Sequence, residues 1–576
     1  MAGESDRADD RAPRWGSDVV ADAVRWTGVP YVALNPGASF RGLHDSLVNH
    51  LGNTRPEILM CLHEEHAVAL AHGYAKVTGS PLAVALHSNV GLMHASMAIY
   101  NAYCDRMPML ILGATGPVDA AARRPWIDWI HTAADQAALV RPFLKWDDQP
   151  GSIPAAVESL NRAWHLTTTA PRAPVYVCLD AGLQEQELAD DTTPPAMLAT
   201  PADSQSSTVE SVRDTANALR SARRPVMLAG RTSRDPADWQ QRVALAESLG
   251  AAVITDLKAG AAFPTDHPLH VPAPGYFLSR PAIDVLAAAD CVLSLDWIDL
   301  AGTLRQARQG APPPEVISAS LDASLHNGWS KDHQALAPVS RWLASTPDVA
   351  VRQLLELLSS DPAPPWATSD AEIPVGPSPL HPLTRSLRRA LDGLSTCLVR
   401  VPLGFSGDDW PVRGPLDYLG YDGGGGLGSG PGMTVGAALA LRDTGRIPVS
   451  VLGDGDFLMG VQALWTAAHH HVPLLLVVAN NRSYFNDELH QERVARRRER
   501  DVTNRWVGQR IDDPAPDLAA LARAQGLVGF GPIGGGEALD EVLQQAVKQV
   551  VDGHAVVVDA VVDTGYDATM TTSLTR

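Results

Sequence analysis

Cysteine is scarce in this chain, and its few positions exclude two common kinds of site. Five cysteines occur among 576 residues, at positions 61, 104, 178, 291 and 397, and no two have CxxC spacing. A disulfide framework and a cysteine-based zinc site are therefore not expected, and small buried hydrophobic residues are the plain interpretation of these thiols. The lack of paired cysteines indicates a reducing, cytoplasmic location.

Long apolar runs and net positive charge are also missing. No segment has 18 consecutive apolar residues, and the N-terminal stretch MAGESDRADDRAPRW is polar, so no membrane span and no secretory signal are expected. The formal net charge is −19, which argues against a nucleic-acid partner because phosphate backbones attract positive surfaces. With 45 % hydrophobic and 19 % charged residues, the chain is typical of a large enzyme of about three domains.

Apolar strand-like runs alternate with helix-like runs in three blocks, which predicts an α/β protein with three consecutive doubly wound parallel-sheet domains. The expected segments are a disordered N-terminus at 1–14, domains at 15–185, 208–358 and 380–563, linkers at 186–207 and 359–379, and a C-terminal tail at 564–576. Strands are expected at 31–34, 82–86, 109–112, 175–179, 225–229, 252–255, 291–295, 315–318, 396–401, 449–452, 474–478 and 555–561. Ligands of such folds bind at the carboxyl ends of the strands, so polar residues after strands are the candidate site residues.

The most informative polar residues follow two successive strands of the third block. Gly453, Asp454 and Gly455 end one apolar run, Asn480 and Asn481 end the next, and 24 residues separate Gly455 from Asn480. Because both ends of an α/β unit point the same way, Asp454 and Asn481 are expected to meet at one edge of the sheet. Carboxylate and amide oxygens suit Mg²⁺, which shares its coordination sphere with phosphate oxygens. For the glycine–aspartate turn taken alone, an ordinary turn is the alternative.

This spacing resembles the GDG-x(24–27)-NN signature of thiamine diphosphate-dependent enzymes, and nearly the whole chain resembles the acetolactate synthase and benzoylformate decarboxylase superfamily. The resemblance implies pyrimidine-binding, central and diphosphate-binding domains, in that order, with thiamine diphosphate and Mg²⁺ as cofactors. The third domain's implied cofactor contacts are Gly453, Asp454, Gly455, Asp456, Asn481 and Ser483. Of these, Asp454, Asn481 and the backbone carbonyl of Ser483 are the implied metal ligands.

The first block matches a second signature of this superfamily. Glu64 and Glu65 follow a short strand-like stretch, and Gly73-Tyr74-Ala75 begins nine residues after Glu64, which resembles the family's E-x(8)-GYA pattern. This register implies that Glu64, rather than Glu65, is the cofactor-activating glutamate. Its hydrogen bond to N1′ of the aminopyrimidine lets the 4′-imino nitrogen take the thiazolium C2 proton. A solvated helix end is the alternative for two adjacent glutamates.

A glycine-rich stretch, DGGGGLG from Asp422, leads into an alanine-rich helix-like run. The resemblance places Gly425 among the cofactor contacts and Leu427 at the bulky residue that wedges between the two cofactor rings. An ordinary core leucine is the alternative for Leu427.

Several elements bear on the substrate. His87, in a Leu-His-Ser element that resembles benzoylformate decarboxylase, is predicted to move protons, and a structural histidine is the alternative. Ala38 stands where a benzoylformate decarboxylase has a serine, which weakens the interpretation as a simple 2-keto acid decarboxylase. Gln136 aligns with a glutamine shared by synthases and acyl-CoA lyases, and we expect it to approach the active site across a subunit boundary.

The segment YFNDELHQERVARRR and the tail TGYDATMTTSLTR resemble bacterial 2-hydroxyacyl-CoA lyases, which are relatives of oxalyl-CoA decarboxylase. Glu488 and Glu492 share a helix face, and Glu492 or His87 is the candidate base for a substrate hydroxyl. The arginines are candidate contacts for substrate phosphates, and a charged solvent face is the alternative for the whole segment. In such lyases the tail can close over the site, and the central domain can hold an ADP-like or CoA moiety. The candidate nucleotide or CoA contacts here are Gly230, Arg231, Thr232 and Asp322.

The resemblance therefore implies a lyase that cleaves the C1–C2 bond of an acyl-CoA substrate, such as 2-hydroxyisobutyryl-CoA, into formyl-CoA and a ketone or aldehyde, and that also runs in reverse. A 2-keto acid decarboxylase or acetolactate synthase-type carboligase is one alternative, and a non-catalytic thiamine diphosphate-binding homologue is another. In this superfamily the pyrimidine-binding domain of one chain faces the diphosphate-binding domain of another. A homo-oligomer is therefore expected, which is a dimer at least and, as the resemblance implies, a homotetramer. Glu64 and Asp454 of one site are expected to come from different subunits.

Overall fold

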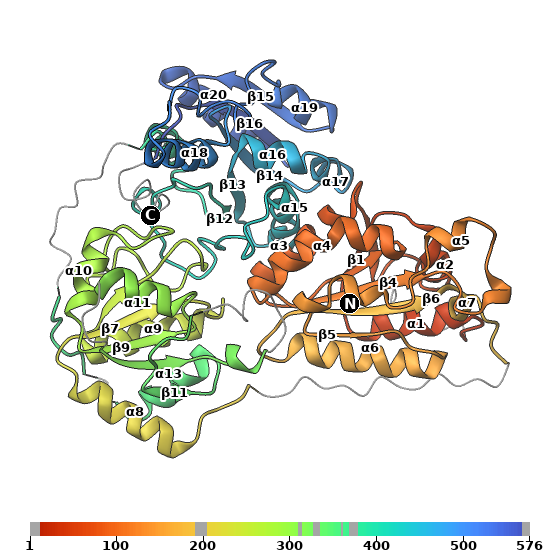
Figure 1. Ribbon diagram of the computed structural model, residues 1–576, viewed down its shortest axis with the longest axis horizontal. Helices are drawn as coiled ribbons and strands as arrows, with labels where there is room; N and C mark the ends of the chain where they lie inside the picture. Colours follow the sequence, from red (N-terminus) through yellow and green to blue (C-terminus); the bar gives the residue numbers. More distant parts are fainter. Residues whose placement is uncertain are drawn as a thin grey trace, which may run out of the picture. The chain divides into compact units, whose positions relative to one another are not determined.

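Three parallel sheets make up the protein, as a computed structural model shows for residues 12–189, 204–308, 314–325, 335–358, 361–367 and 378–566 (Figure 1). This confirms the predicted fold class. The sheets fall into two compact units: one holds the first sheet and residues 422–437, and the other holds the second and third sheets. Most of both predicted linkers, the first 11 residues and the tail from 567 onward lie outside the described residues. No helix of the described residues is long and apolar enough to cross a membrane.

The first sheet has six strands in the order β2-β1-β3-β4-β6-β5, and every neighbouring pair is parallel. Its strands are β1 (Tyr31–Leu34), β2 (Glu57–Met60), β3 (Ala83–Leu86), β4 (Met109–Thr115), β5 (Trp146–Asp148) and β6 (Pro174–Asp180). The helices are α1 (Gly16–Trp26), α2 (Arg41–Asp45), α3 (Glu64–Thr78), α4 (Ser88–Cys104), α5 (Ile127–Ile130), α6 (Ile153–Thr168) and α7 (Ala181–Gln184). Helices α3 and α4 cover one face and α1 and α6 the other, so β3, β4 and β6 are buried at every residue (Figure 1).

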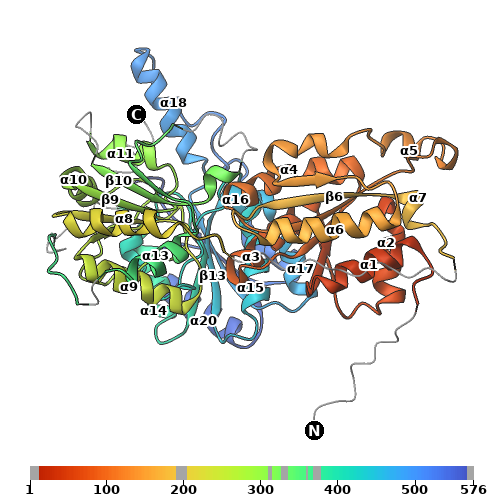
Figure 2. The ribbon, with the colours of Figure 1, turned by 90° about the horizontal axis from the view of Figure 1, so that it is seen from below.

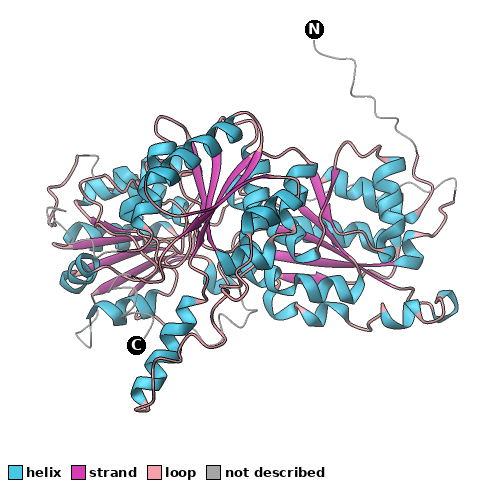
Figure 3. Ribbon diagram, turned by 90° about the horizontal axis from the view of Figure 1, so that it is seen from above, coloured by secondary structure: helices cyan, strands magenta, loops and turns pink. Residues whose placement is uncertain are grey.

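The second sheet has five parallel strands in the order β11-β10-β9-β7-β8. They are β7 (Pro225–Ala229), β8 (Ala252–Ile254), β9 (Cys291–Leu295), β10 (Glu315–Ala319) and β11 (Arg341–Leu343). The helices of this domain are α8 (Val209–Ser221), α9 (Pro236–Leu249), α10 (Arg280–Ala288), α11 (Leu300–Arg308) and α13 (Pro347–Leu355). Two separate apolar clusters pack on the sheet, so helices cover both of its faces (Figure 3).

The third sheet also has five parallel strands, in the order β12-β13-β14-β16-β15. They are β12 (Thr396–Arg400), β13 (Ile447–Gly453), β14 (Leu474–Asn480), β15 (Val528–Ile533) and β16 (Ala555–Val561). The helices are α14 (His381–Ala390), α15 (Ser429–Leu441), α16 (Asp454–Gly460), α17 (Ala463–His469), α18 (Phe485–Arg497), α19 (Leu518–Ala524) and α20 (Glu537–Val551). Helix α18 projects from the body of its unit (Figure 2). Strands β13 and β14 end side by side, which positions the turns that follow them.

Candidate functional site

The two polar turns of the third domain follow neighbouring strands. Strand β13 ends at Gly453 and β14 ends at Asn480, and Gly453 lies opposite Ala479 in their parallel register. Asp454 and Asn481 therefore leave the sheet at the same edge, as the strand pattern predicts. Gly455 has no room for a side chain, because a Cβ there would lie 2.5 Å from the Tyr484 ring.

Asp454 carries a buried carboxylate with one oxygen free to bind a cation. Its Oδ1 accepts a hydrogen bond from the Gly455 N–H at 3.0 Å, whereas Oδ2 is buried and has no hydrogen-bond partner in the described part of the chain. Burial raises the pKa of Asp454 to about 6, and the N–H groups of Gly455, Arg482 and Ser483 partly oppose this rise. A divalent cation would remove the desolvation penalty of this oxygen, so the residue fits the predicted Mg²⁺ position.

The loop after β14 is held in a fixed shape beside Asp454. Asn481 Oδ1 accepts a hydrogen bond from the Ser483 N–H at 2.9 Å, and Asn480 Nδ2 donates to Asp559 Oδ1 on β16 at 2.9 Å. Asn480 thus anchors the loop to the sheet. The Asp454 carboxylate, the Asn481 amide and the Ser483 carbonyl form an oxygen donor set of the kind that holds Mg²⁺ and a diphosphate. Their assignment as ligands stays a prediction.

Asp456 is engaged in a buried ion pair. Its Oδ2 lies 3.3 Å from both Nε and Nη2 of Arg400, and the guanidinium lies over the Tyr421 ring at 4.2 Å from the centroid. Asp456 is 5 % exposed and Arg400 2 % exposed. The pair fixes the first turn of α16, so a cofactor contact by Asp456 is expected from its main chain.

The glycine-rich loop is tied down by two side chains. Asp422 Oδ1 accepts a hydrogen bond from the Gly425 N–H at 2.7 Å, and Asn101 on α4 pairs with both the N–H and the carbonyl of Gly426 at 3.3 Å. Gly425 has φ +77°, which favours glycine. Leu427 follows these anchors and is partly exposed, so it is available for the predicted contact with the cofactor rings. This anchoring role of Asn101 was not predicted from the sequence.

Glu64 begins helix α3 and lies against α4. His63 caps the helix, because its Nδ1 accepts a hydrogen bond from the Glu65 N–H at 3.1 Å, and Gly79 ends it with φ +68°. The Glu64 side chain is 8 % exposed, and its Oε2 lies 3.0 Å from His94 Nδ1. His94 was not predicted as a site residue from the sequence, where only its position seven residues after His87 could have indicated it.

His87 lines a cavity at the carboxyl edge of the first sheet. The cavity has a volume of about 140 Å³, and its polar lining residues are Ser39, Arg41, His87, Arg124, Asp128 and His131. Ser39 Oγ lies 2.9 Å from His87 Nδ1, and the Ser39 N–H donates to the same nitrogen at 3.4 Å. Nδ1 is therefore the acceptor, and Nε2 carries the proton of the neutral ring. Burial, and then the nearby His131, lower the pKa of His87. Ala38 also lines this cavity, where it adds no hydroxyl.

Gln136 lies in the interior of the first domain. It is fully buried, and its Nε2 donates to the Ala114 carbonyl at 3.1 Å and to the Tyr176 hydroxyl at 2.7 Å. The side chain is thus enclosed by its own domain, and an approach of Gln136 to an active site across a subunit boundary stays a prediction.

The two glutamates of α18 are both held by arginines. Glu488 is fully buried and accepts hydrogen bonds from Ser483 Oγ at 2.6 Å and from Arg510 Nε at 3.2 Å. Glu492 pairs with Arg496 and Arg505, and their hydrogen bonds lower the pKa of Glu492. A carboxylate with a lowered pKa is a weaker base, so the geometry disfavours Glu492 for the predicted deprotonation of a substrate hydroxyl.

The candidate nucleotide contacts of the central domain bind one another. Arg231 Nε lies 2.9 Å from Asp296 Oδ2, and Arg231 Nη2 lies 3.4 Å from Asp322 Oδ2. Gly230 lies against the Asp296 backbone, where a Cβ would be 2.4 Å from the carbonyl oxygen, and Thr232 Oγ1 is buried without a hydrogen bond in the described residues. Arg231 is thus committed to two carboxylates, which argues against its use as a phosphate contact.

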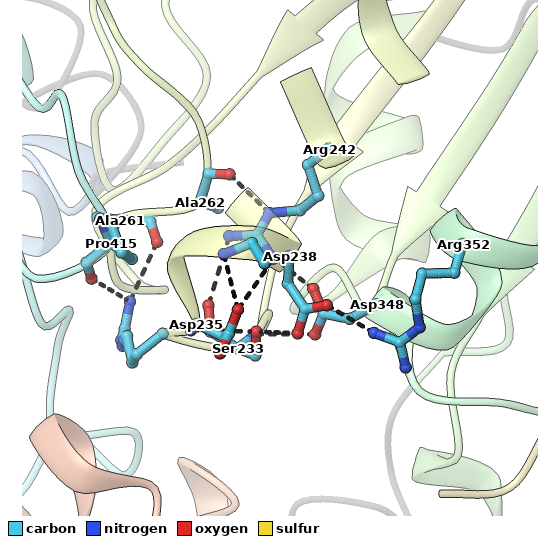
Figure 4. Close-up of polar contacts among 11 residues, drawn as sticks. Ser233, Asp235, Asp238, Arg242, Ala261, Ala262, Asp348, Arg352 and Pro415 are labelled. Carbon is cyan, nitrogen blue, oxygen red and sulfur yellow. Dashed lines mark hydrogen bonds and ion pairs between the residues drawn. The ribbon is translucent and has the colours of Figure 1, made fainter. Parts of the chain in front are cut away.

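The loop after these residues is fixed by a buried ion pair. Arg242 on α9 is fully buried, pairs with Asp348, and donates from Nε to the Ala262 carbonyl at 3.0 Å (Figure 4). Asp348 Oδ2 accepts the Ser233 N–H at 2.9 Å. Nearby, the more exposed Arg352 pairs with Asp238 at 2.6 Å.

Three models of one enzyme family match the chain. The central TPP enzyme domain matches residues 212–324, the N-terminal TPP binding domain 14–139, and the C-terminal TPP binding domain 406–560. Together these matches span more than half of the chain.

Curated relatives cover most of the chain at low identity. The probable 2-ketoarginine decarboxylase of Pseudomonas aeruginosa is 26 % identical over 84 % of this chain and 83 % of its own length. The benzoylformate decarboxylase of the same species is 24 % identical over 87 % and 90 %. The large subunit of acetolactate synthase isozyme 1 from Escherichia coli is 24 % identical over 81 % of each chain.

Solved structures share the whole fold. The thiamine diphosphate-dependent 4-hydroxybenzoylformate decarboxylase of Rhodococcus jostii superposes with a TM-score of 0.75 and 22 % identity, over 96 % of this chain and 99 % of its own. A thiamin diphosphate-dependent enzyme from Mycobacterium smegmatis gives the same TM-score at 21 % identity, over 96 % and 100 %. With the matching domains in the family's order and the family's motifs at the strand ends, the chain belongs to the thiamine pyrophosphate enzyme family.

Proposed function

We propose that the protein uses thiamine diphosphate and Mg²⁺ to cleave a small 2-keto acid next to its carbonyl group with release of CO₂. The remaining fragment is then either protonated and released or joined to a second carbonyl compound. The observation that carries this proposal is the cavity of about 140 Å³ beside His87. Its volume suits a carboxylate-sized or short polar group. His87 lines it as a hydrogen-bond donor, whereas Arg41 and Arg124 are paired with Glu185 and Asp128. The curated decarboxylases that the chain resembles support this substrate class.

Bound thiamine diphosphate supplies the electron sink for cleavage next to a carbonyl. The chain's own residues would hold and move protons around that chemistry. Glu64, the first residue of α3, packs against α4 and would share a proton with the aminopyrimidine N1′. His87, held neutral and fixed through Nδ1 by Ser39, would offer the proton on Nε2 to the substrate.

A 2-hydroxyacyl-CoA lyase, which would release formyl-CoA and a ketone or aldehyde, is the second candidate. The exposed arginines of α18 and the turn after it favour this candidate, because Arg493, Arg497, Arg498 and Arg500 are positive charges of the kind that binds the phosphates of CoA. The ion-paired state of Arg231 and the lowered pKa of Glu492 count against it.

A single substrate panel tests the proposal. The protein, loaded with thiamine diphosphate and Mg²⁺, is incubated with pyruvate, benzoylformate, 2-hydroxyisobutyryl-CoA, mandelyl-CoA and oxalyl-CoA, and both CO₂ and formyl-CoA are measured. Saturable CO₂ release from a 2-keto acid without CoA supports the first candidate. Formyl-CoA from a hydroxyacyl thioester, with no turnover of the keto acids, would replace it with the second.

The proposal includes a homodimer at least, in which Glu64 and Asp454 of one site belong to different chains. Mixing the inactive variants Glu64→Gln and Asp454→Asn after reversible dissociation tests this arrangement. Random pairing makes half of the dimers mixed, and each mixed dimer has one intact site, so activity should return to about a quarter of the wild-type value. No recovery despite proven mixing would show that both residues of a site come from one chain.

A further inference from the structure

We infer that His63, Glu64 and His94 form a binding site for a transition-metal ion, with Zn²⁺ as the best-matched species. Each residue offers one ligand atom, and the three atoms lie within 4.8 Å of one another. In the described part of the chain, this is the one such group of histidine, cysteine and acidic side chains. Its donor set of two imidazoles and one carboxylate leaves a coordination position open for water.

The fold of the first unit prearranges these ligands. His94 Nδ1 lies 3.0 Å from Glu64 Oε2, and the rings of His63 and His94 stack with centroids 4.8 Å apart and planes at 23°. Gly91 on α4 makes room for the Glu64 carboxylate, because a Cβ at position 91 would lie 3.1 Å from Glu64 Oε1. Ligand atoms around a tetrahedral zinc ion are about 3.4 Å apart, so the widest separation must shrink by at most about 1.4 Å.

The site can admit an ion and can adjust to it. The His94 side chain is 58 % exposed, so its ring can turn toward an ion that enters from solvent, while Glu64 is held by the surrounding helices. If His63 Nδ1 binds the metal, it can no longer accept the hydrogen bond from the Glu65 N–H. If Nε2 binds the metal, the ring proton must move to Nδ1, which ends the same hydrogen bond. Either change exchanges one hydrogen bond for a metal–nitrogen bond.

The donor set also separates this ion from Mg²⁺. Imidazole nitrogen suits Zn²⁺, Co²⁺ and Ni²⁺, whereas Mg²⁺ prefers oxygen ligands such as those beside Asp454. An ion at this site would engage the Glu64 carboxylate. Zn²⁺ would then oppose cofactor binding, a consequence that rests on the role proposed for Glu64, whereas the metal site itself does not.

Direct titration tests the site in the full-length, tag-free protein after removal of metal and cofactor. Zn²⁺ is followed by calorimetry, and Co²⁺ by its visible absorption bands. We expect one ion per chain, bound at least tenfold more weakly in His94→Ala and in His63→Asn, which keeps an acceptor for the helix cap. The matched control is the double variant His469→Ala/His471→Ala, which removes two histidines of the run at the C-terminal end of α17 and should bind as the wild type does.

Two results would overturn the inference. One is the lack of saturable binding by the wild type. The other is loss of binding in the His469→Ala/His471→Ala control together with unchanged binding in His94→Ala, which would assign the ion to the histidine run. A third titration, in saturating Mg²⁺ and thiamine diphosphate, should weaken Zn²⁺ binding at least tenfold. Unchanged Zn²⁺ affinity there would leave the metal site standing and count against the proposed role of Glu64.

Discussion

Replacing Asp348 by asparagine should loosen the loop that carries the candidate nucleotide contacts. The substitution keeps the side-chain shape and an acceptor for the Ser233 N–H, but it removes the charge that balances the fully buried Arg242. Burial lowers the pKa of Arg242, and Asp348 opposes that effect. The charged guanidinium therefore depends on Asp348 for its stability inside the protein. Breaking a buried ion pair on one side costs about 3–5 kcal/mol.

Hydrogen exchange of β7 and α9 measures this loss locally. If exchange follows the opening equilibrium, a cost of that size speeds exchange by roughly 100- to 4,000-fold. Asp238→Asn is the matched control, because its pair with Arg352 is much more exposed and is expected to contribute about 1 kcal/mol or less. Equal acceleration in the two variants would refute the assignment of the loop's stability to the buried pair.

Three further predictions concern the site and the packing around it. Asp454→Asn should abolish the increase in unfolding temperature that Mg²⁺ and thiamine diphosphate together give. The cofactor-free variant should be more stable than the cofactor-free wild type, because no buried charge remains at this position. A retained increase with the cofactors would exclude Asp454 as a ligand. Because burial and His131 lower the pKa of His87, the neutral ring should persist below pH 6.5, and His131→Ala should move the acid limb of kcat/KM to higher pH; an unmoved limb would exclude His87 as its source. Gly73→Ala should destabilise the first unit by about 1–3 kcal/mol in urea unfolding, because its Cβ would lie 2.0 Å from the Met433 carbonyl, and unchanged stability would show that the contact is loose.

The sequence predicted the central strands well, and it predicted the edge strands β8 and β12 but not β5, β11 and β15. β1 was predicted with its observed bounds, and β14 was predicted two residues short, because continuous apolar runs identify strands that are buried on both faces. The missed strands β5, β11 and β15 each lie at an edge of their sheet. Edge strands bury less surface and tolerate charge, as in Trp146–Asp148, or glycine and proline, as in Val528–Ile533.

The strand-end motifs predicted where Asp454 and Asn481 lie, but not what the other candidates contact. The partners of Asp456 and Arg231 are 56 and 65 residues away in the chain, and only the folded sheets bring them together. For the same reason, the pattern of Glu488 and Glu492 on one helix face indicated a possible acid or base, while arginines from the following loop occupy both carboxylates. The alignment of Gln136 likewise carried no information about its burial.

Exchange of the C2 proton of bound thiamine diphosphate tests the central claim most directly. With the cofactor and Mg²⁺ bound, the wild type should exchange this proton for deuterium at least about 100-fold faster than Glu64→Gln, whereas Glu65→Gln should match the wild type. Equal exchange in the wild type and Glu64→Gln would contradict the account, and slow exchange in Glu65→Gln alone would transfer the activating role to Glu65.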